Sequence, residues 1–354
     1  MNKDVNNGQS RREFLGRSVA ALAAASFLPS AFSCTGKSVA APAPVDTAAE
    51  AGKVNSKFGG VQIGTITYSW RSMPGGLENI IKYCQEANIS SIELMGGDLE
   101  AYLGAPENPM MKFFRRQASQ PAAKPGEKPA FTPEQQAEID KYKEEVKAWR
   151  LGLDLSKVEG ARKLLSDAGI SVHIVKMQPS GMGSDEEVDY AFKVAKAMGA
   201  KAVTDEINLE TAKRVAPFAE KHGMYMAFHN HMQYAEEGFS CDPILAISPS
   251  IMLNFDAGHF FGSTGIHPNE MIKKYHDRIY SIHLKDKTGP TTGDQPNTNQ
   301  VWGQGEMPLE DVLLLIKQEK WPIYCDIELE YDIKPWSDSV KEVGTWVKYA
   351  RQIL

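Results

Sequence analysis

The chain has 354 residues, of which 42% are apolar and 24% are charged. These values are typical of a globular protein with one large domain or two small ones, and they exclude a disordered or fibrous chain. The 39 basic and 45 acidic residues give a formal net charge of −6. This acidic balance argues against a nucleic-acid partner, which would require a basic surface. Four cysteines are too few for a scaffold framed by disulfides.

Residues 1–34 have the features of an export signal. The pair Arg11 and Arg12 precedes an apolar, alanine-rich stretch at residues 18–32. A charged start followed by a short apolar core and small residues is typical of a secretory signal, and the arginine pair resembles the twin-arginine signal of bacteria. The residues before Cys34 resemble an imperfect lipoprotein cleavage box. We therefore expect an exported protein, periplasmic or held at the cell envelope, whose only membrane contact would be a lipid on Cys34.

Residues 35–57 are rich in Ala, Pro, Ser, Thr and Lys, which predicts a flexible linker. From residue 58 to 354, short apolar runs alternate with segments whose apolar residues recur at the helical period. The eight predicted strands begin at Val61, Ile89, Ile170, Ala200, Tyr225, Ser250, Ile279 and Pro322. Eight βα units in a row predict an α/β fold, a single (β/α)8 TIM barrel. An open doubly wound sheet is the weaker alternative, because no glycine-rich phosphate turn follows the first predicted strand.

Two connections are longer than the others. Residues 96–150 form an insertion after the second predicted strand, with a Pro/Gln/Lys-rich centre (118–133) and a charged helix (134–149). Residues 286–307 form a Gly/Thr/Asn/Pro-rich loop after the seventh. Both follow the carboxyl end of a strand, which is the active face of such a barrel. We expect a lid or substrate wall there, with a tolerated surface insertion as the alternative.

Polar side chains alternate with apolar ones in most of the predicted strands. Side chains two residues apart share a face, so the polar residues should face the barrel interior if the apolar ones face the helices. The inward set comprises Glu93, Glu206, His229, His231, Asn254, Asp256, His283, Lys285, Asp326, Glu328 and Glu330. Buried charges must be paired or bound to a metal. Carboxylates mixed with imidazoles suit a divalent cation such as Mn²⁺, Zn²⁺, Co²⁺, Fe²⁺ or Mg²⁺; a salt-bridged network is the alternative.

Five segments carry a more specific resemblance. They are Ala-Phe-His-Asn-His (227–231), Asn-Phe-Asp-Ala-Gly-His (254–259), Ile-His-Leu-Lys-Asp (282–286), Gly-Gln-Gly-Glu (303–306) and Asp-Ile-Glu-Leu-Glu (326–330). In this order they resemble the xylose-isomerase-like TIM-barrel superfamily of sugar phosphate isomerases and epimerases. The resemblance implies a divalent metal held by Asp256, His283 and Glu328. For the fourth ligand the sequence departs from the family, and we expect Glu206, one strand before His229, to supply the carboxylate.

The assignment of the metal ligands leaves alternatives. Sugar epimerases of this group often carry a Glu where His229 stands, so His229 is either a replacement ligand or a substrate contact. Glu330 competes with Glu328, because both face inward. His173 and His259 lie near strand ends, where they are expected to support the ligands.

The resemblance also implies an activity: metal-assisted proton transfer next to the carbonyl of a free or glycosidic keto-sugar. The expected acid/base groups are His229, His231, Lys176 and Glu206. The expected substrate contacts are Trp70, Glu93, Lys285 and Trp302, although Trp side chains are as often plain packing and Lys285 has Asp286 or Glu306 as an alternative partner.

Three other functions remain as alternatives. A lyase or hydratase acting on 3-keto-glycosides uses the same kind of site. A non-catalytic sugar-binding lipoprotein would need a polar barrel mouth without a metal site. An endonuclease for abasic sites shares the barrel, but the acidic charge argues against it. Pairing of barrels into a homo-oligomer is left open.

Overall fold

The computed structural model describes residues 53–110 and 131–354. The predicted export signal with Cys34, most of the predicted linker and most of the Pro/Gln/Lys-rich centre of the insertion lie outside the described residues. In the two described segments, no helix combines the length and the apolar character that crossing a membrane would require.

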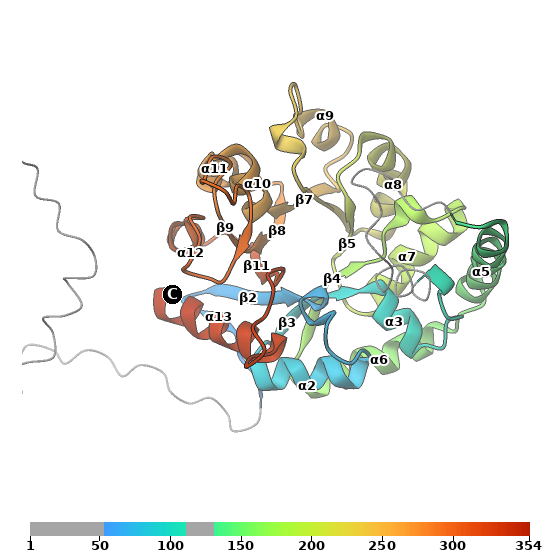
Figure 1. The fold of residues 1–354 in the computed structure, drawn as a ribbon. Coiled ribbons are helices and arrows are strands. Elements are labelled where there is room, and N and C mark those ends of the chain that lie inside the picture. Colours follow the sequence, from blue (N-terminus) through green and yellow to red (C-terminus); the bar gives the residue numbers. More distant parts are fainter. Residues whose placement is uncertain (1–52, 111–130) are drawn as a thin grey trace, which may run out of the picture. The chain divides into compact units, whose positions relative to one another are not determined.

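Eight parallel strands form a closed barrel (Figure 1). In chain order they are β2 (Val61–Ile66), β3 (Ser91–Met95), β4 (Ser171–Lys176), β5 (Ala202–Glu206), β6 (Tyr225–His229), β7 (Ile251–Asp256), β8 (Ile279–Leu284) and β11 (Tyr324–Ile327). Each strand pairs with the next one along the chain, and β2 closes the barrel by pairing with both β3 and β11. The predicted single (β/α)8 barrel is confirmed, and all eight predicted strands are present.

Helices alternate with these strands and surround the barrel (Figure 1). They are α2 (Leu77–Ala87), α6 (Leu155–Asp167), α7 (Asp185–Ala197), α8 (Leu209–His222), α9 (Asp242–Leu245), α10 (Ala257–Thr264), α11 (Pro268–Tyr275), α12 (Leu309–Glu319) and α13 (Ser339–Ile353). Short 3-10 turns lie at Thr67–Trp70, Pro179–Gly181 and Gln233–Ala235. The apolar side of each strand is buried against the helices: Leu253, Phe255, Ile282 and Leu284 are all 1% exposed or less.

The folded barrel begins before residue 58, where the sequence placed the end of the linker. Lys57 and Phe58 form β1 (Lys57–Phe58), which pairs antiparallel with β2. The Ser56 side chain is fully buried and donates a hydrogen bond to the Ile63 carbonyl at 2.6 Å. Asn55 exchanges hydrogen bonds with Asn88. Residues 55–57 therefore belong to the barrel, because their backbone and side chains are paired with it.

The insertion after β3 contains α3 (Gly96–Tyr102) and α5 (Pro133–Leu151), which confirms the predicted charged helix. Thr132 begins α5 with a capping box, since its side chain accepts from Gln135 N and the Gln135 side chain accepts from Thr132 N. Arg150 fixes the other end: it binds both oxygens of Glu100 at 2.8 and 3.0 Å and Glu187 at 3.0 Å. These ion pairs are largely buried, so they anchor α5 to the barrel.

The loop after β8 is tied down at both ends. β9 (Asp286–Lys287) pairs antiparallel with β10 (Asn299–Gln300). Asp286 accepts hydrogen bonds from the backbone of Gly303 and Gly305 at 2.8 and 2.9 Å. Glu306 accepts from Gly289 N and from the Thr292 hydroxyl. The loop is therefore an ordered part of the barrel's carboxyl end.

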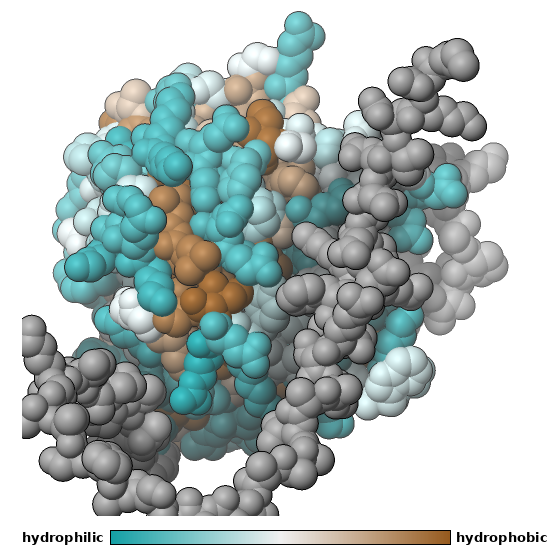
Figure 2. Space-filling model, turned by 90° about the vertical axis from the view of Figure 1, so that its left-hand side faces the viewer, coloured by the Kyte–Doolittle hydropathy of each residue, from teal (hydrophilic) through white to brown (hydrophobic). Residues whose placement is uncertain are grey.

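One side of the surface is drawn in Figure 2, where hydrophilic residues predominate and one apolar strip crosses the face. Exposed large apolar side chains of the described residues include Leu151, Met232, Ile266, Leu314 and Trp336. Single exposed apolar side chains are normal on a globular surface.

Candidate functional site

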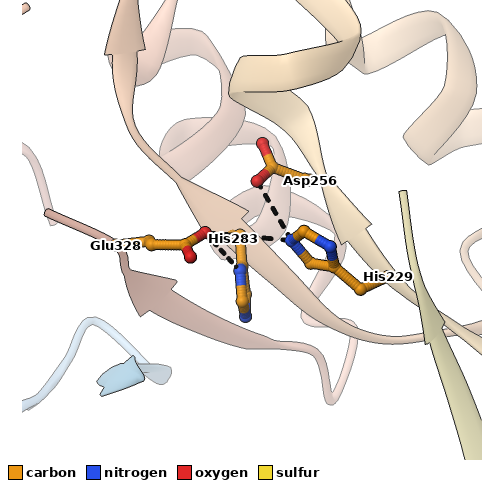
Figure 3. Close-up of side chains that lie close together, drawn as sticks. All are labelled: His229, Asp256, His283 and Glu328. Carbon is orange, nitrogen blue, oxygen red and sulfur yellow. Dashed lines mark hydrogen bonds and ion pairs between the residues drawn. The ribbon is translucent and has the colours of Figure 1, made fainter. Parts of the chain in front are cut away.

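Four buried side chains converge at the carboxyl end of the barrel (Figure 3). His229 ends β6, Asp256 ends β7, His283 lies on β8 and Glu328 directly follows β11. The four residues offer one donor atom each, all within 4.8 Å of one another. His229 Nε2 lies 3.2 Å from Asp256 Oδ2 and 3.8 Å from Glu328 Oε2, and His283 Nδ1 lies 2.8 Å from the same Glu328 oxygen.

This donor set fits a divalent cation. Two imidazoles and two carboxylates are ligands suited to Zn²⁺ and to the first-row divalent metals. Donors about 2.0–2.2 Å from one tetrahedral ion lie roughly 3.3–3.6 Å apart; three pairs of donors here are 2.8, 3.2 and 3.8 Å apart, and all four lie within 4.8 Å of one another. One Asp256 oxygen is already used, because Oδ1 accepts a hydrogen bond from His259 N as the cap of α10. The cap fixes the carboxylate's direction and turns Oδ2 toward the cluster, where it lies 3.2 Å from His229 Nε2 and 2.8 Å from Lys285 Nζ.

Lys285 lies against the same carboxylates. Its Nζ is 2.8 Å from Asp256 Oδ2, 2.8 Å from Glu328 Oε2 and 2.7 Å from Glu330 Oε2, and the residue is 2% exposed. The alternative partners expected for it, Asp286 and Glu306, bind backbone amides instead. Lys285 therefore supplies positive charge to the carboxylates at the centre of the site.

Glu206 and Lys176 form the rim of the cluster. Glu206 Oε2 lies 3.2 Å from His229 Nδ1 and 3.7 Å from His231 Nε2, and Lys176 Nζ donates to Glu206 Oε1 at 3.1 Å. The side chain of Glu206 is 36% exposed and that of His231 is 51% exposed, whereas His229 is almost fully buried. Glu206 therefore contacts the cluster at the imidazole of His229, and part of its side chain is exposed to solvent.

A second polar layer lies deeper in the barrel. Glu93 Oε2 is 2.9 Å from His283 Nε2 and accepts from Asn254 Nδ2 at 2.7 Å. Asp326 Oδ2 lies 2.8 Å from His173 Nε2 and accepts from the Ser281 hydroxyl. Glu93 is fully buried, so it supports His283 from below and is out of reach of a substrate at the mouth. His173 supports Asp326 in the same way.

The charges of the cluster hold its groups in defined protonation states. Burial alone would raise the pKa of Asp256 and of Glu328, but Lys285 and the neighbouring imidazoles lower both well below their usual range. Burial would lower the pKa of His229, but hydrogen bonds to Asp256, Glu206 and Glu328 raise it to about 9. For His231, burial and the nearby His229 lower the pKa. Burial also lowers the pKa of His259, to about 3.

The expected aromatic sugar contacts are placed in the core. Trp70 is 4% exposed and packs on Tyr83, with ring centroids 5.6 Å apart. Trp302 is 7% exposed and stacks on Trp346 at 4.8 Å. Both rings pack against helical side chains, so packing is the role the structure shows for them.

Sequence reasoning missed two residues of the site. Asn230 accepts a hydrogen bond from Asp256 N at 3.0 Å and donates to the Asp256 carbonyl, which fixes the end of β7. Lys287 is 3% exposed beside the cluster, although its strand β9 was expected to be loop.

Comparison with known proteins identifies the fold family. A family model described as xylose isomerase-like TIM barrel matches residues 145–350. The inosose dehydratase of Clostridium botulinum (strain Alaska E43 / Type E3) is 28% identical over 137 residues, which are 34% of this chain and 45% of that protein. The inosose dehydratase of Clostridium perfringens (strain 13 / Type A) is 26% identical over 141 residues, 35% of this chain and 46% of that protein. The match thus spans less than half the length of these relatives.

Solved structures share the barrel at low sequence identity. The probable 3-DHS dehydratase AsbF from Bacillus anthracis superposes with a TM-score of 0.53 and 12% identity, over 81% of this chain and 98% of that one. The IOLI protein with a bound zinc atom superposes with a TM-score of 0.52 and 12% identity, over 83% of this chain and 98% of that one. The D-allulose 3-epimerase from Methylomonas sp. superposes with a TM-score of 0.52 and 13% identity, over 85% of this chain and 100% of that one. These likenesses concern the fold, and the family model covers more than half of the sequence; the chain therefore belongs to the xylose isomerase-like TIM barrel family.

Proposed function

We propose that the protein is a divalent-metal-dependent enzyme that moves a proton next to the carbonyl of a free or glycosidic keto-sugar. The observation that carries this proposal is the convergence of four buried donors from four strands on one point. Charged side chains are rarely buried without a partner or a metal. Their place at the carboxyl end of the barrel is where enzymes of this architecture hold their substrates.

The residues that would hold the cation are His229, Asp256, His283 and Glu328. The sequence predicts Glu206 as the fourth ligand. In the structure the ring of His229 lies between Glu206 and Asp256, so we assign the fourth ligand to His229. When bound, the cation would polarise a sugar carbonyl and so acidify the neighbouring C–H. Lys285 would keep Asp256 and Glu328 ionised and oriented, and we propose that its ammonium would stabilise negative charge on a substrate oxygen.

Proton transfer falls to the groups on the rim. Burial would raise the pKa of Glu206, but the hydrogen bond to His229 and nearby positive charges lower it, so its carboxylate is ionised at neutral pH and able to accept a proton. His231 is half exposed and, with a lowered pKa, is neutral at that pH. Lys176 holds Glu206 in place at 3.1 Å. We therefore assign proton abstraction to Glu206 or His231, with Lys176 as the residue that positions Glu206.

Two outcomes of the same first step remain. Return of the proton to the other face or to the neighbouring carbon gives epimerisation or isomerisation, and loss of a β-hydroxyl gives dehydration. The relatives named above include dehydratases and an epimerase, which supports sugar-processing chemistry of either kind. We favour an isomerase or epimerase and keep a lyase or hydratase acting on 3-keto-glycosides as the second candidate.

The decisive experiment is a screen of keto-sugars in deuterated water with the metal-loaded protein, followed by NMR. Solvent deuterium should appear at a carbon next to the carbonyl, and the labelled position and the product distinguish an epimerase from a dehydratase. Asp256→Asn should abolish the exchange, whereas Lys213→Met on the outer face of α8 should leave it unchanged. Sugar binding without deuterium incorporation in the metal-loaded protein would instead support a non-catalytic sugar-binding protein.

We also propose that the protein is exported by its twin-arginine signal. The proposal rests on the sequence of residues 1–34, and it favours free or glycosidic sugars as substrates over phosphorylated ones, which are mainly cytosolic. Replacing Arg11 and Arg12 by Lys should leave the precursor in the cytoplasm, which cell fractionation would detect. Normal processing of that variant would contradict the proposal.

A further inference from the structure

Lys287 is a buried cation without a partner beside the proposed metal site. The residue is 3% exposed, yet in the described part of the chain no carboxylate pairs with it and no group accepts a hydrogen bond from its Nζ. The neighbouring lysines differ: Lys285 contacts three carboxylates within 2.8 Å, and Lys176 pairs with Glu206. A largely buried lysine that forms neither an ion pair nor a hydrogen bond is unusual, so this position needs an explanation.

Two glycines of α10, Gly258 and Gly262, leave space for the side chains of Lys285 and Lys287. A Cβ at Gly258 would overlap the Lys285 side chain, and a Cβ at Gly262, one turn later, would lie 2.7 Å from Lys287 Cε. The side chains of Lys285 and Lys287 therefore cross the same helix face side by side. The Lys285 side chain ends at Asp256 and Glu328, whereas the ammonium of Lys287 is bound by no described group.

Other polar atoms near Lys287 also lack partners. Asn297 Oδ1 would overlap the same Gly262 Cβ, which places it next to the Lys287 stem, and it accepts no hydrogen bond. His259 Nδ1 is buried without a partner as well, and the other ring nitrogen of His259 lies 3.8 Å from Asp256 Oδ2. Unpaired buried polar atoms are few in folded proteins. A donor, an acceptor and an imidazole nitrogen left unpaired in one place indicate a binding site.

The charge at this place identifies the kind of group that fits. The three carboxylates around Lys285 carry three negative charges, which Lys285 and a divalent cation would balance. The charge of Lys287 then remains, and a neutral hydroxyl would solvate it without compensating it. Asn297 Oδ1 needs a donor, which a hydroxyl next to the anionic group supplies. A carboxylate carries the single negative charge that Lys287 would balance, whereas a phosphate monoester carries about −1.5 to −2 at neutral pH.

Resting on the proposed function, we propose that Lys287, with Asn297, binds the carboxylate end of an acidic sugar and so restricts the substrate class to sugar acids. Lys287 donates to the carboxylate, Asn297 accepts from the adjacent hydroxyl, and the carbonyl end of the same molecule points to the cluster of His229, Asp256, His283 and Glu328. Lys287 is thus a specificity residue that takes no part in proton transfer.

The test compares acidic and neutral sugars in matched pairs by ligand-observed NMR on the metal-loaded protein. The pairs are glucuronate with glucose, galacturonate with galactose and gluconate with sorbitol, and glucose 6-phosphate tests the phosphate arm. The wild type should prefer an acidic member, and Lys287→Met should weaken that member about ten- to a hundred-fold while leaving the neutral one unchanged. Asn297→Asp should also remove the preference, because the new carboxylate would pair with Lys287.

Lys213→Met serves as the control, since it removes one positive charge from an exposed position far from the site. Wild-type protein without a preference for any acidic member would overturn the proposal, as would a preference that survives in Lys287→Met. Tighter binding of the phosphate than of the carboxylates would overturn the assignment to sugar acids. Failure of the proposed function is a separate result: the metal would be missing, or deuterium exchange on keto-sugars would not occur, whatever residue stands at position 287.

Discussion

Replacement of Glu93 by Gln is the change that best separates metal support from general packing. Glu93 is fully buried beneath His283, and its Oε2 lies 2.9 Å from His283 Nε2. Burial would raise the pKa of Glu93, but the charge of His283 and the hydrogen bond to it lower it, so the carboxylate is ionised at neutral pH. With a cation bound at Nδ1, Glu93 would hold the imidazole with its proton on Nε2.

The expected magnitude follows from that contact. Carboxylates that bind the far nitrogen of a metal-binding histidine typically contribute 10- to 100-fold to metal affinity, which corresponds to about 1.4–2.8 kcal/mol. Gln has the same shape and still accepts a hydrogen bond, so the fold should survive with His283 less basic. The hydrogen bond from Asn254 Nδ2, 2.7 Å long, becomes weaker as well.

Competition with a chelator of known affinity measures Zn²⁺ or Mn²⁺ binding, and ¹⁵N-resolved NMR of the histidine rings reports the tautomer of His283. Glu187→Gln is the matched control, because Glu187 is a buried carboxylate outside the cluster that pairs with Arg150. The reasoning is refuted if Glu93→Gln binds the metal as tightly as the wild type. It is also refuted if Glu187→Gln weakens binding by the same factor, since the loss would then be general.

Three further predictions concern stability. In protein stripped of divalent cations, protonated His229 stabilises the fold fully below the unfolded pKa near 6.5, and this contribution is lost as the pH rises through about 9; the Tm measured by calorimetry should fall over that interval, and a flat Tm would argue against the protonated imidazole. Arg150→Met should destabilise the anchoring of α5 by about 3–5 kcal/mol, seen as faster proteolysis within the insertion, whereas Lys143→Met, at an exposed pair on the same helix, should have little effect. Gly64→Ala should lower the free energy of unfolding by about 1–3 kcal/mol, because the new Cβ would overlap Asp326 Oδ1; an unchanged denaturation midpoint would contradict this.

The sequence predicts the barrel and the inward set well, because both follow from periodicity. Strand side chains alternate strictly, so the apolar residues beside Asp256 and His283 determine which way these two face. Eight such strands separated by helices leave few topologies other than a closed barrel. Three members of the cluster, Asp256, His283 and Glu328, follow from that geometry.

What the sequence could not predict depends on side-chain reach. Alternation places Glu206 and His229 on inward faces of neighbouring strands, but only the rotamers and lengths show that the imidazole reaches Asp256 while the carboxylate stays behind it. The three partners of Lys285 come from two different strands and could not be read from local pattern. Trp302 packs on Trp346, which lies on the last helix, so its burial depends on a contact between distant parts of the chain.

Metal analysis combined with X-ray absorption spectroscopy tests the central claim most directly. The purified protein, loaded with Zn²⁺ and freed of excess ion, should hold one equivalent with two imidazole nitrogens and carboxylate oxygens in its first coordination shell. His229→Ala should remove one nitrogen from the spectrum, and Glu206→Gln should leave the ligand set intact. Absence of tight binding, or a spectrum that changes with Glu206 and not with His229, would contradict the account.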